Sequence, residues 1–325
     1  MQRRQFHLAM AGACLWPHVG AHASAGYPTK PVRIVVPYSA GGPVDLISRA
    51  LAVSLGQSWN QPVVVDNKPG ANELIAAAEV ARALPDGHTL VMGSDPTLSQ
   101  NRFLYAKMPY DDEKAFAPVI RLAVINMALF VPAGLPVSNL QEFLAYAKAR
   151  PRQLSYGSSG IGNVTHLSMA WLEKSTGIEM THLPYKGLAP VVSDMLGSQI
   201  QAAFGAVSVV EPYVKSGKLK AIAVSGDRRA KLLPQVATFT EQGHPGIDAN
   251  LTVALLAPSG TPGDVVGTIA NDVRTILLQP AFREKYIDGV AFDLVADTPA
   301  QFAAYLVKDR ERQLLRIQAS GVRLE

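Results

Sequence analysis

Short runs of aliphatic and β-branched residues alternate along this chain with longer stretches of helical periodicity. The runs that we expect to form strands cover residues 32–36, 62–65, 89–92, 154–157, 200–204, 219–224 and 253–256. Their near-continuous apolar character is typical of parallel strands covered on both faces. Strands that alternate with helices predict the α/β fold class.

Three segments carry signals for the start of a helix. Ser138 with Gln141 matches a capping box, and Thr261 before Pro262 matches an N-cap followed by proline at the first helical position. Thr298 begins a third such segment, with Pro299 and Gln301 behind it. We expect these helices to be scaffold without chemical roles.

The 325-residue chain is long enough for two lobes with separate cores. Because no Gly/Ser-rich linker divides it, we expect the lobes to be joined by strands that cross more than once. A net charge of +4 without a Lys/Arg run argues against nucleic acid as the partner.

The N-terminus has the features of a secretory signal peptide covering residues 1–23. Arg3 and Arg4 precede an apolar stretch, and Ala21 and Ala23 form a small-x-small cleavage site. The paired arginines also match the twin-arginine export motif, so the export route stays open. No later segment reaches the ~20 uninterrupted apolar residues that a membrane span needs.

Cys14 is the only cysteine in the sequence, and it lies within the predicted signal peptide. Its surroundings match a lipoprotein cleavage site poorly. The mature chain would therefore contain no disulfide, thiol nucleophile or cysteine-based metal site. We expect no metal and no cofactor.

The most informative segment is a glycine-rich loop between a predicted strand and a predicted helix. It contains Tyr38, Ser39, Ala40, Gly41 and Gly42. Unpaired N–H groups at the start of such a helix attract anions, and the two glycines let a carboxylate approach the backbone. The loop matches neither GxGxxG nor GxxxxGK[ST], which argues against nucleotide binding.

A second loop of the same kind follows the strand predicted at 154–157. Ser158, Ser159, Asn163 and Thr165 offer short polar groups there, and His166 begins the helix behind them. Taken alone, this loop is equally well explained as a capped helix start. Two such loops, one in each half of the chain, are what a cleft between two lobes needs to hold an anion.

Several ordered segments resemble one protein family, the Bug-type, or TctC-like, periplasmic substrate-binding proteins of tripartite tricarboxylate transporters. The matching segments are residues 27–33, 37–45, 61–71, 85–90, 105–111, 182–187, 217–224 and 257–262. The resemblance implies a type II periplasmic binding protein, or Venus flytrap, with two α/β lobes joined by crossing strands. We assign residues 24–127 plus 252–325 to lobe 1 and residues 128–251 to lobe 2.

The resemblance also implies a function, which is to bind a small carboxylate-bearing metabolite in the cleft and deliver it to membrane permease subunits. Di- or tricarboxylates, acidic amino acids and aromatic or pyridine carboxylates are the implied ligands. We expect a monomer. The implied ligand-binding residues are those of the two loops together with Asp45, Tyr185 and Lys186, although Asp45 is also explained as a cap of the first helix and Lys186 as a surface lysine.

Three segments depart from the pattern of the family. Residues 72–74 read Asn-Glu-Leu where members often have Gly-Gly-Asn. Gly205 and Ala206 replace polar residues, which would widen the pocket for a bulkier or aromatic ligand. Ser94 and Asp95 stand where small or hydroxyl residues are usual. Asp95 either caps the helix that follows it or points into the cleft, where it would favour a ligand nitrogen over a second carboxylate.

Two other functions remain open at this stage. The same cleft would serve a sensor that presents its closed form to a histidine kinase of a two-component system. A serine-dependent hydrolase is a remote alternative, because the sequence lacks a GxSxG elbow. The HExxH motif of metal-dependent hydrolases is absent as well. We therefore expect a protein that is not an enzyme.

Overall fold

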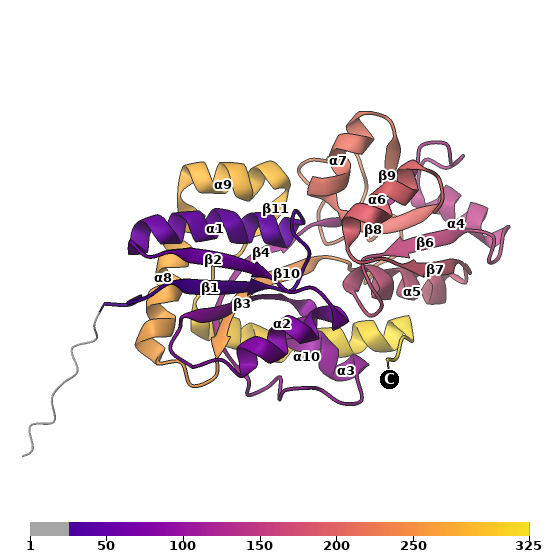
Figure 1. Ribbon diagram of the computed structural model, residues 1–325. Coiled ribbons are helices and arrows are strands. Elements are labelled where there is room, and N and C mark those ends of the chain that lie inside the picture. Colours follow the sequence, from indigo (N-terminus) through magenta and orange to yellow (C-terminus); the bar gives the residue numbers. More distant parts are fainter. Residues whose placement is uncertain (1–25, 325) are drawn as a thin grey trace, which may run out of the picture.

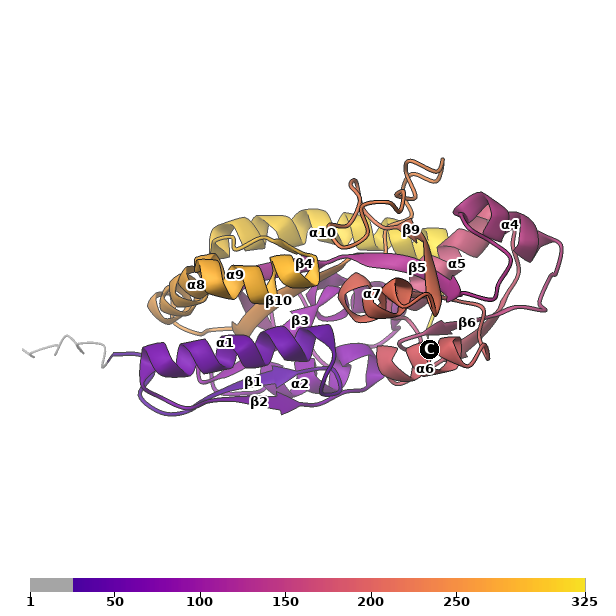
Figure 2. The same ribbon diagram turned by 90° about the horizontal axis from the view of Figure 1, so that it is seen from above.

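The computed structural model describes residues 26–324, which form two α/β lobes lying side by side (Figure 1). The predicted signal peptide, its arginine pair and Cys14 lie outside the described residues. The chain leaves the first sheet at Asn126 and returns to it with β10, so the first lobe is built from both ends of the chain (Figure 2).

The first lobe contains a six-stranded mixed sheet with the order β11-β4-β10-β3-β1-β2. Its strands are β1 (Val32–Val36), β2 (Val63–Asn67), β3 (Thr89–Ser94), β4 (Phe116–Ile125), β10 (Leu251–Pro258) and β11 (Phe292–Leu294). Strand β1 pairs in parallel with β2 and β3, whereas β10 runs antiparallel to both β3 and β4.

Helices cover this sheet. They are α1 (Pro43–Trp59), α2 (Leu74–Ala81), α3 (Asn101–Leu104), α8 (Gly263–Leu278), α9 (Pro280–Tyr286) and α10 (Pro299–Ser320), with the short turns η1 (Ala71–Glu73), η2 (Pro96–Gln100) and η3 (Asp288–Val290). Buried residues such as Ile34, Leu51 and Leu255 form the core between the sheet and the helices. Helix α10 continues beyond the first lobe and packs against α5 of the second (Figures 1 and 2).

The second lobe contains a five-stranded sheet with the order β7-β6-β8-β5-β9. Its strands are β5 (Met127–Pro132), β6 (Ser155–Ser158), β7 (Thr181–Pro184), β8 (Ala202–Ala206) and β9 (Leu219–Val224). Its helices are α4 (Leu140–Lys148), α5 (Val164–Thr176), α6 (Leu188–Leu196) and α7 (Val207–Lys215). The fold class is the predicted two-lobed α/β flytrap.

Each predicted strand is present, and β1 and β9 have the predicted bounds. Four strands, β4, β5, β7 and β11, were not predicted. The expectation of parallel strands is wrong for β9 and β10, because their pairings with other strands are antiparallel. Strand β10 lies inside its sheet and β9 at the edge of the other. A strand can be covered on both faces in either orientation, so its apolar character does not reveal its direction.

Two of the three predicted helix starts are displaced by one residue. Asn139, rather than Ser138, caps α4, because its side chain accepts a hydrogen bond from the N–H of Glu142. Pro262 is the N-cap residue of α8, whereas the Thr261 hydroxyl donates to the Pro258 carbonyl. The capping box of Thr298 and Gln301 at α10 is confirmed.

Candidate functional site

A cavity of about 260 Å³ lies between the lobes, and we call it the cleft cavity. It is lined from the first lobe by Tyr38, Ser39, Ala40, Gly41, Gly42, Pro43, Val44, Ile125 and Leu251, and from the second by Met127, Ser159, Asn163, Val164, Thr165, Lys186, Gly187, Leu188, Ala189, Ala206 and Val209. A second cavity of about 600 Å³ shares several of these residues and extends past Glu73, Tyr105 and Tyr185; we call it the outer cavity.

The N-terminal ends of four helices meet at the cleft cavity. The N-cap residues are Gly42 of α1, Asn163 of α5, Gly187 of α6 and Ala206 of α7, and all four line the cavity. Within residues 26–324, only Asn163 among them makes a side-chain capping hydrogen bond. The first turns of the other three helices carry partial positive charge and have no side-chain cap. Their free donors are fewer than in a regular helix start, because Pro43 in α1 and Pro190 in α6 have no N–H and the Val207 N–H of α7 donates to the Asn126 carbonyl.

The first loop is held in shape by a carboxylate beneath it. Asp45 is buried and accepts hydrogen bonds from the Gly41 N–H at 2.9 Å, from Arg49 at 2.8 Å and from Asn67 at 2.8 Å. Burial raises the pKa of Asp45, but these hydrogen bonds outweigh it and hold the pKa below its usual range. Asp45 does not line either cavity. Its role is to position the loop, and the prediction that it contacts the ligand is not supported.

The second loop is organised by a chain of short side chains. The Thr165 hydroxyl accepts the N–H of Ser159 at 2.9 Å, and the Asn163 side-chain oxygen accepts the N–H of Thr165 at 3.2 Å. Ser159, Asn163 and Thr165 all line the cleft cavity. This loop thus combines a capped helix start with a face toward the cleft. The two interpretations drawn from the sequence, a capped helix start and a ligand-binding loop, are therefore compatible.

Ser158 and His166 lie behind this loop rather than in the cleft. The Ser158 hydroxyl is fully buried and lies 2.7 Å from Nε2 of His182. The rings of His166 and His182 stack at 4.0 Å, and Nδ1 of His166 accepts the N–H of Gly162. Burial lowers the pKa of His166 to about 4, and the neighbouring His182 adds to this effect.

The predicted ligand contacts of Ser158 and His166 therefore need correction, because both side chains support the loop from within the second lobe. Ser158 and His182 have the spacing of a nucleophile and a base. Ser158 is nevertheless sealed from the cleft, and no carboxylate in residues 26–324 makes a hydrogen bond to His182. The serine-hydrolase alternative consequently has no accessible nucleophile at this position.

The buried carboxylate of Glu73 accepts hydrogen bonds from polar groups at the end of β3. Glu73 accepts hydrogen bonds from the Tyr38 hydroxyl at 2.5 Å, from the hydroxyl and N–H of Ser94, and from the hydroxyl and N–H of Thr97. Burial raises the pKa of Glu73, and the hydrogen bonds partly oppose this. Ser94 is fully buried in this cluster and does not line the cleft, contrary to the prediction.

Asp95 likewise points away from the cleft. It is fully buried, accepts the N–H of Thr252 at 3.1 Å and pairs with Arg316 of α10 at 3.0 Å. It makes no side-chain capping bond to the following helix. Asp95 thus holds the N-cap position of η2, but its carboxylate neither bonds to the first turn of that helix nor points into the cleft.

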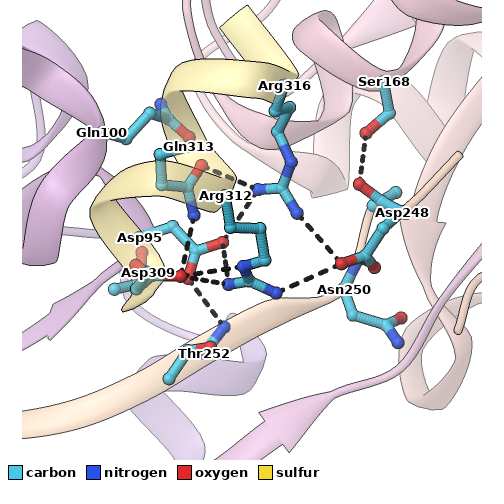
Figure 3. Close-up of polar contacts among 12 residues, drawn as sticks. Asp95, Gln100, Ser168, Asp248, Asn250, Thr252, Asp309, Arg312, Gln313 and Arg316 are labelled. Atoms are coloured by element: carbon cyan, nitrogen blue, oxygen red, sulfur yellow. Dashed lines mark hydrogen bonds and ion pairs between the residues drawn. The ribbon is translucent and has the colours of Figure 1, made fainter. Parts of the chain in front are cut away.

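The network around Asp95 links α10 of the first lobe to the segment before β10 and to α5 of the second lobe (Figure 3). Arg312 and Arg316 of α10 both reach Oδ2 of Asp248 at 3.2 Å, in the segment that leads back to the first lobe. Ser168 of α5, in the second lobe, donates to the Asp248 carbonyl. This cluster is structural support for the connection between the lobes.

The remaining predicted positions divide between the cleft and the core. Tyr185 lines the outer cavity and donates to Asp194 at 2.5 Å, and its pKa is raised to about 12 by partial burial and by this carboxylate. Lys186 is exposed and lines both cavities. Ala206 lines the cleft cavity, but Gly205 packs against Leu188 and Val210 and contributes nothing to the cavity surface.

The structure thus brings together at the cleft a large part of the predicted set. These residues are Tyr38, Ser39, Ala40, Gly41, Gly42, Ser159, Asn163, Thr165, Tyr185, Lys186 and Ala206. Asp45, Ser94, Asp95, Ser158, His166 and Gly205 do not line it. Ligand contact by the first group stays a prediction.

Sequence reasoning missed the apolar residues of the cleft cavity. Ile125, Met127 and Leu251 lie on β4, β5 and β10, which are the strands where the chain crosses between the lobes. Successive side chains of a strand point to opposite faces. Val124, Asn126 and Asn250 line a separate cavity of about 550 Å³ on the opposite face. The available signal was the pair of strands β4 and β5, which are separated only by Asn126.

Within residues 26–324, no group of three or more His, Cys, Asp or Glu side chains is arranged to hold a metal ion. No helix in this range is long and apolar enough to span a membrane.

Comparison with known proteins gives consistent matches along the chain. The model of the tripartite tricarboxylate transporter family receptor matches residues 47–322. A Cupriavidus necator protein encoded in the gbd 5′ region is 35% identical over 318 residues, which cover 95% of each chain.

Solved structures agree with these sequence matches. An R. palustris protein solved with adipate superposes with a TM-score of 0.87 at 30% identity, covering 91% of this chain and 99% of that one. The periplasmic binding protein BugD superposes with a TM-score of 0.85 at 30% identity, covering 92% of this chain and 100% of that one.

Proposed function

Because the chain belongs to the tripartite tricarboxylate transporter receptor family, we propose that it is a periplasmic solute receptor that binds a small carboxylate and delivers it to membrane permease subunits. Export by the N-terminal signal peptide is part of this proposal. The closed form would be stabilised by a ligand that contacts both lobes at once.

One observation carries the proposal, namely the convergence of four helix N-termini on a cavity between the lobes. Each helix start contributes partial positive charge and N–H donors, which suit a carboxylate. Gly42 brings these groups from the first lobe, and Asn163, Gly187 and Ala206 bring them from the second. A carboxylate between them would hold the lobes together.

The relative solved with adipate supports this ligand class. Neutral N–H donors are also appropriate for a receptor, because they bind an anion without the strong ion pair that would slow its release to a permease. Among residues 26–324, Lys186 is the only lysine or arginine that lines the cleft cavity or the outer cavity.

A binding panel tests the proposal. The purified protein is heated with each of a set of mono-, di- and tricarboxylates, amino acids and pyridine carboxylates. A ligand at 100 times its dissociation constant adds about 2.7 kcal/mol to the free energy of unfolding, which raises the midpoint by several degrees. Recovery of the compound unchanged supports a receptor, whereas turnover or a flat panel contradicts the proposal.

A second experiment addresses delivery. Cells that lack this protein should lose uptake of the identified carboxylate and regain it when the protein is restored. Normal uptake, together with loss of a transcriptional response to the carboxylate, would instead indicate the sensor role.

A further inference from the structure

The surface of the cleft cavity is divided between polar loops and an apolar wall. The wall consists of Val44, Ile125, Met127, Leu188, Val209 and Leu251. Ile125, Met127 and Leu251 lie on the crossing strands, while the other three belong to the first turns of helices. The N–H groups of the same helix starts face the cavity, so an anion site and an apolar surface lie next to each other.

The cleft cavity and the outer cavity differ in the charged side chains that line them, and this difference affects which ligand they can hold. Lys186 is the one cationic side chain among the described lining residues, and it is exposed to solvent. Glu73 lines the outer cavity, where it holds Tyr38, Ser94 and Thr97 by hydrogen bonds. The cleft cavity itself has no aspartate or glutamate among its described lining residues.

We propose that the ligand has a single carboxylate and an apolar arm, with the carboxylate at the helix starts and the arm against the wall. This inference rests on the proposed function and narrows it to a substrate class. The wall offers no hydrogen-bond donor from its side chains to a second carboxylate, and burying an unpaired carboxylate there is strongly unfavourable. In the outer cavity, a second carboxylate would meet Glu73.

Apolar contacts between the ligand and the wall, by contrast, increase the affinity. Each methylene group moved from water to an apolar surface is worth about a fourfold gain in affinity. A six-carbon monocarboxylate would therefore use the wall along its chain and end in a methyl group. A six-carbon dicarboxylate has the same length but places a charge at the position of that methyl group.

Hexanoate and adipate form this matched pair, and calorimetric titration of both into the purified protein tests the inference. We expect hexanoate to bind at least about tenfold more tightly than adipate, and phenylacetate to behave like hexanoate. Equal or tighter binding of adipate would overturn the inference and leave the proposed function intact. If neither these acids nor any other carboxylate binds, both fail.

A charge added to the wall should reverse the preference. Val209→Lys places an ammonium group on the wall from α7, where the half-buried Val209 lines the cleft cavity. We expect this variant to bind hexanoate more weakly and adipate about tenfold more tightly than the original protein.

The matched control is Val214→Lys, because Val214 lies on the same helix, is also half-buried and does not line either cavity. We expect the control to leave both affinities unchanged. A folded Val209→Lys variant with unchanged affinities would overturn the inference, and if that variant does not fold, the comparison of the two acids on the original protein still decides.

Discussion

The carboxylate of Asp95 and the guanidinium of Arg316 form an ion pair of 3.0 Å in which both side chains are almost entirely shielded from water. Asp95 directly follows β3, and Arg316 lies on α10, so the pair fixes the C-terminal helix to the first sheet. Burial raises the pKa of Asp95, and Arg312 and Arg316 oppose that effect. Arg316 also reaches Asp248, which extends the connection toward the crossing strands (Figure 3).

Removal of Arg316 should therefore destabilise the protein without a direct effect on the ligand. Arg316→Met leaves the carboxylate of Asp95 buried with a weaker partner in Arg312, and we expect a loss of about 3–5 kcal/mol in the free energy of unfolding. Urea unfolding measures it. The control is Lys308→Met on the exposed face of the same helix, which should change stability by less than about 0.5 kcal/mol. Equal stability of the two variants would contradict the structural role of the pair.

The Asp95–Arg316 pair also explains why sequence reasoning failed at this position. The partner of Asp95 lies 221 residues later in the chain, and nothing near Asp95 indicates it. A charged residue beside a predicted cleft therefore looked like a ligand contact. Short-range signals came closer: the capping box at Thr298 and Gln301 was predicted correctly because all its groups lie within four residues, and the other two predicted helix starts were displaced by one residue.

The cleft shows the same division between local and distant signals. The loop at Gly41 and Gly42 was predicted because a strand, two glycines and a helix follow one another directly. The apolar wall was not predicted, because an apolar residue that lines a cavity has the same sequence signature as one in the core. Ile125 and Met127 were hidden further by the absence of any turn signal between β4 and β5.

The two glycines of the first loop should respond differently to substitution. Gly41 has φ +86°, a conformation that costs other residues about 1 kcal/mol or more, and a side chain there would meet nothing within 4 Å. Gly42 has φ −78° and ψ 168°, which any residue adopts. We expect Gly41→Ala to lower the free energy of unfolding by about 1 kcal/mol.

For Gly42→Val we expect nearly unchanged stability but carboxylate affinity at least about tenfold weaker, because the new side chain covers the N–H groups of α1 at the cavity. Titration calorimetry and urea unfolding on both variants separate the two effects. If Gly42→Val bound carboxylates as well as the original protein, the first loop would not be part of the anion site.

Stability should fall in mild acid because of His166. Its pKa is lowered to about 4 in the folded protein from the ordinary value of 6.5, mainly by burial. Between these two values the unfolded chain binds more protons at this site than the folded protein does. The free energy of unfolding should therefore decrease as the pH falls from 6.5 towards 4, by at most about 3 kcal/mol.

Urea unfolding of the original protein and of His166→Gln at about pH 7, 5.5 and 4.5 isolates this contribution. Groups that do not contact His166 titrate in both proteins, so their effects cancel in the difference. What remains is the titration of His166 and of the stacked His182, which is coupled to it. We expect the stability advantage of the original protein over the variant to shrink in acid. A difference that is independent of pH would show that His166 does not titrate with a lowered pKa.

The lobes are also joined beside the cleft by a direct hydrogen bond. Gln100 is fully buried in η2 of the first lobe, and its side-chain amide donates to the Gly162 carbonyl of the second loop at 2.7 Å. Asn72 reaches the same carbonyl at 3.3 Å. An opening of the cleft that separates the second loop from the first lobe has to break both bonds, so they stabilise the arrangement in which the two loops lie on either side of the cleft cavity.

Gln100→Leu keeps a similar volume but removes the donor, and we expect carboxylate affinity to fall about two- to tenfold, mainly through faster dissociation. Stopped-flow dissociation and calorimetry measure both quantities. Gln153→Leu, on the exposed surface of the second lobe, is the control and should bind normally. If Gln100→Leu bound as tightly as the control, closure would depend on the ligand and the hinge alone. The hydrogen bond to Gly162 would then be present in open and closed forms alike.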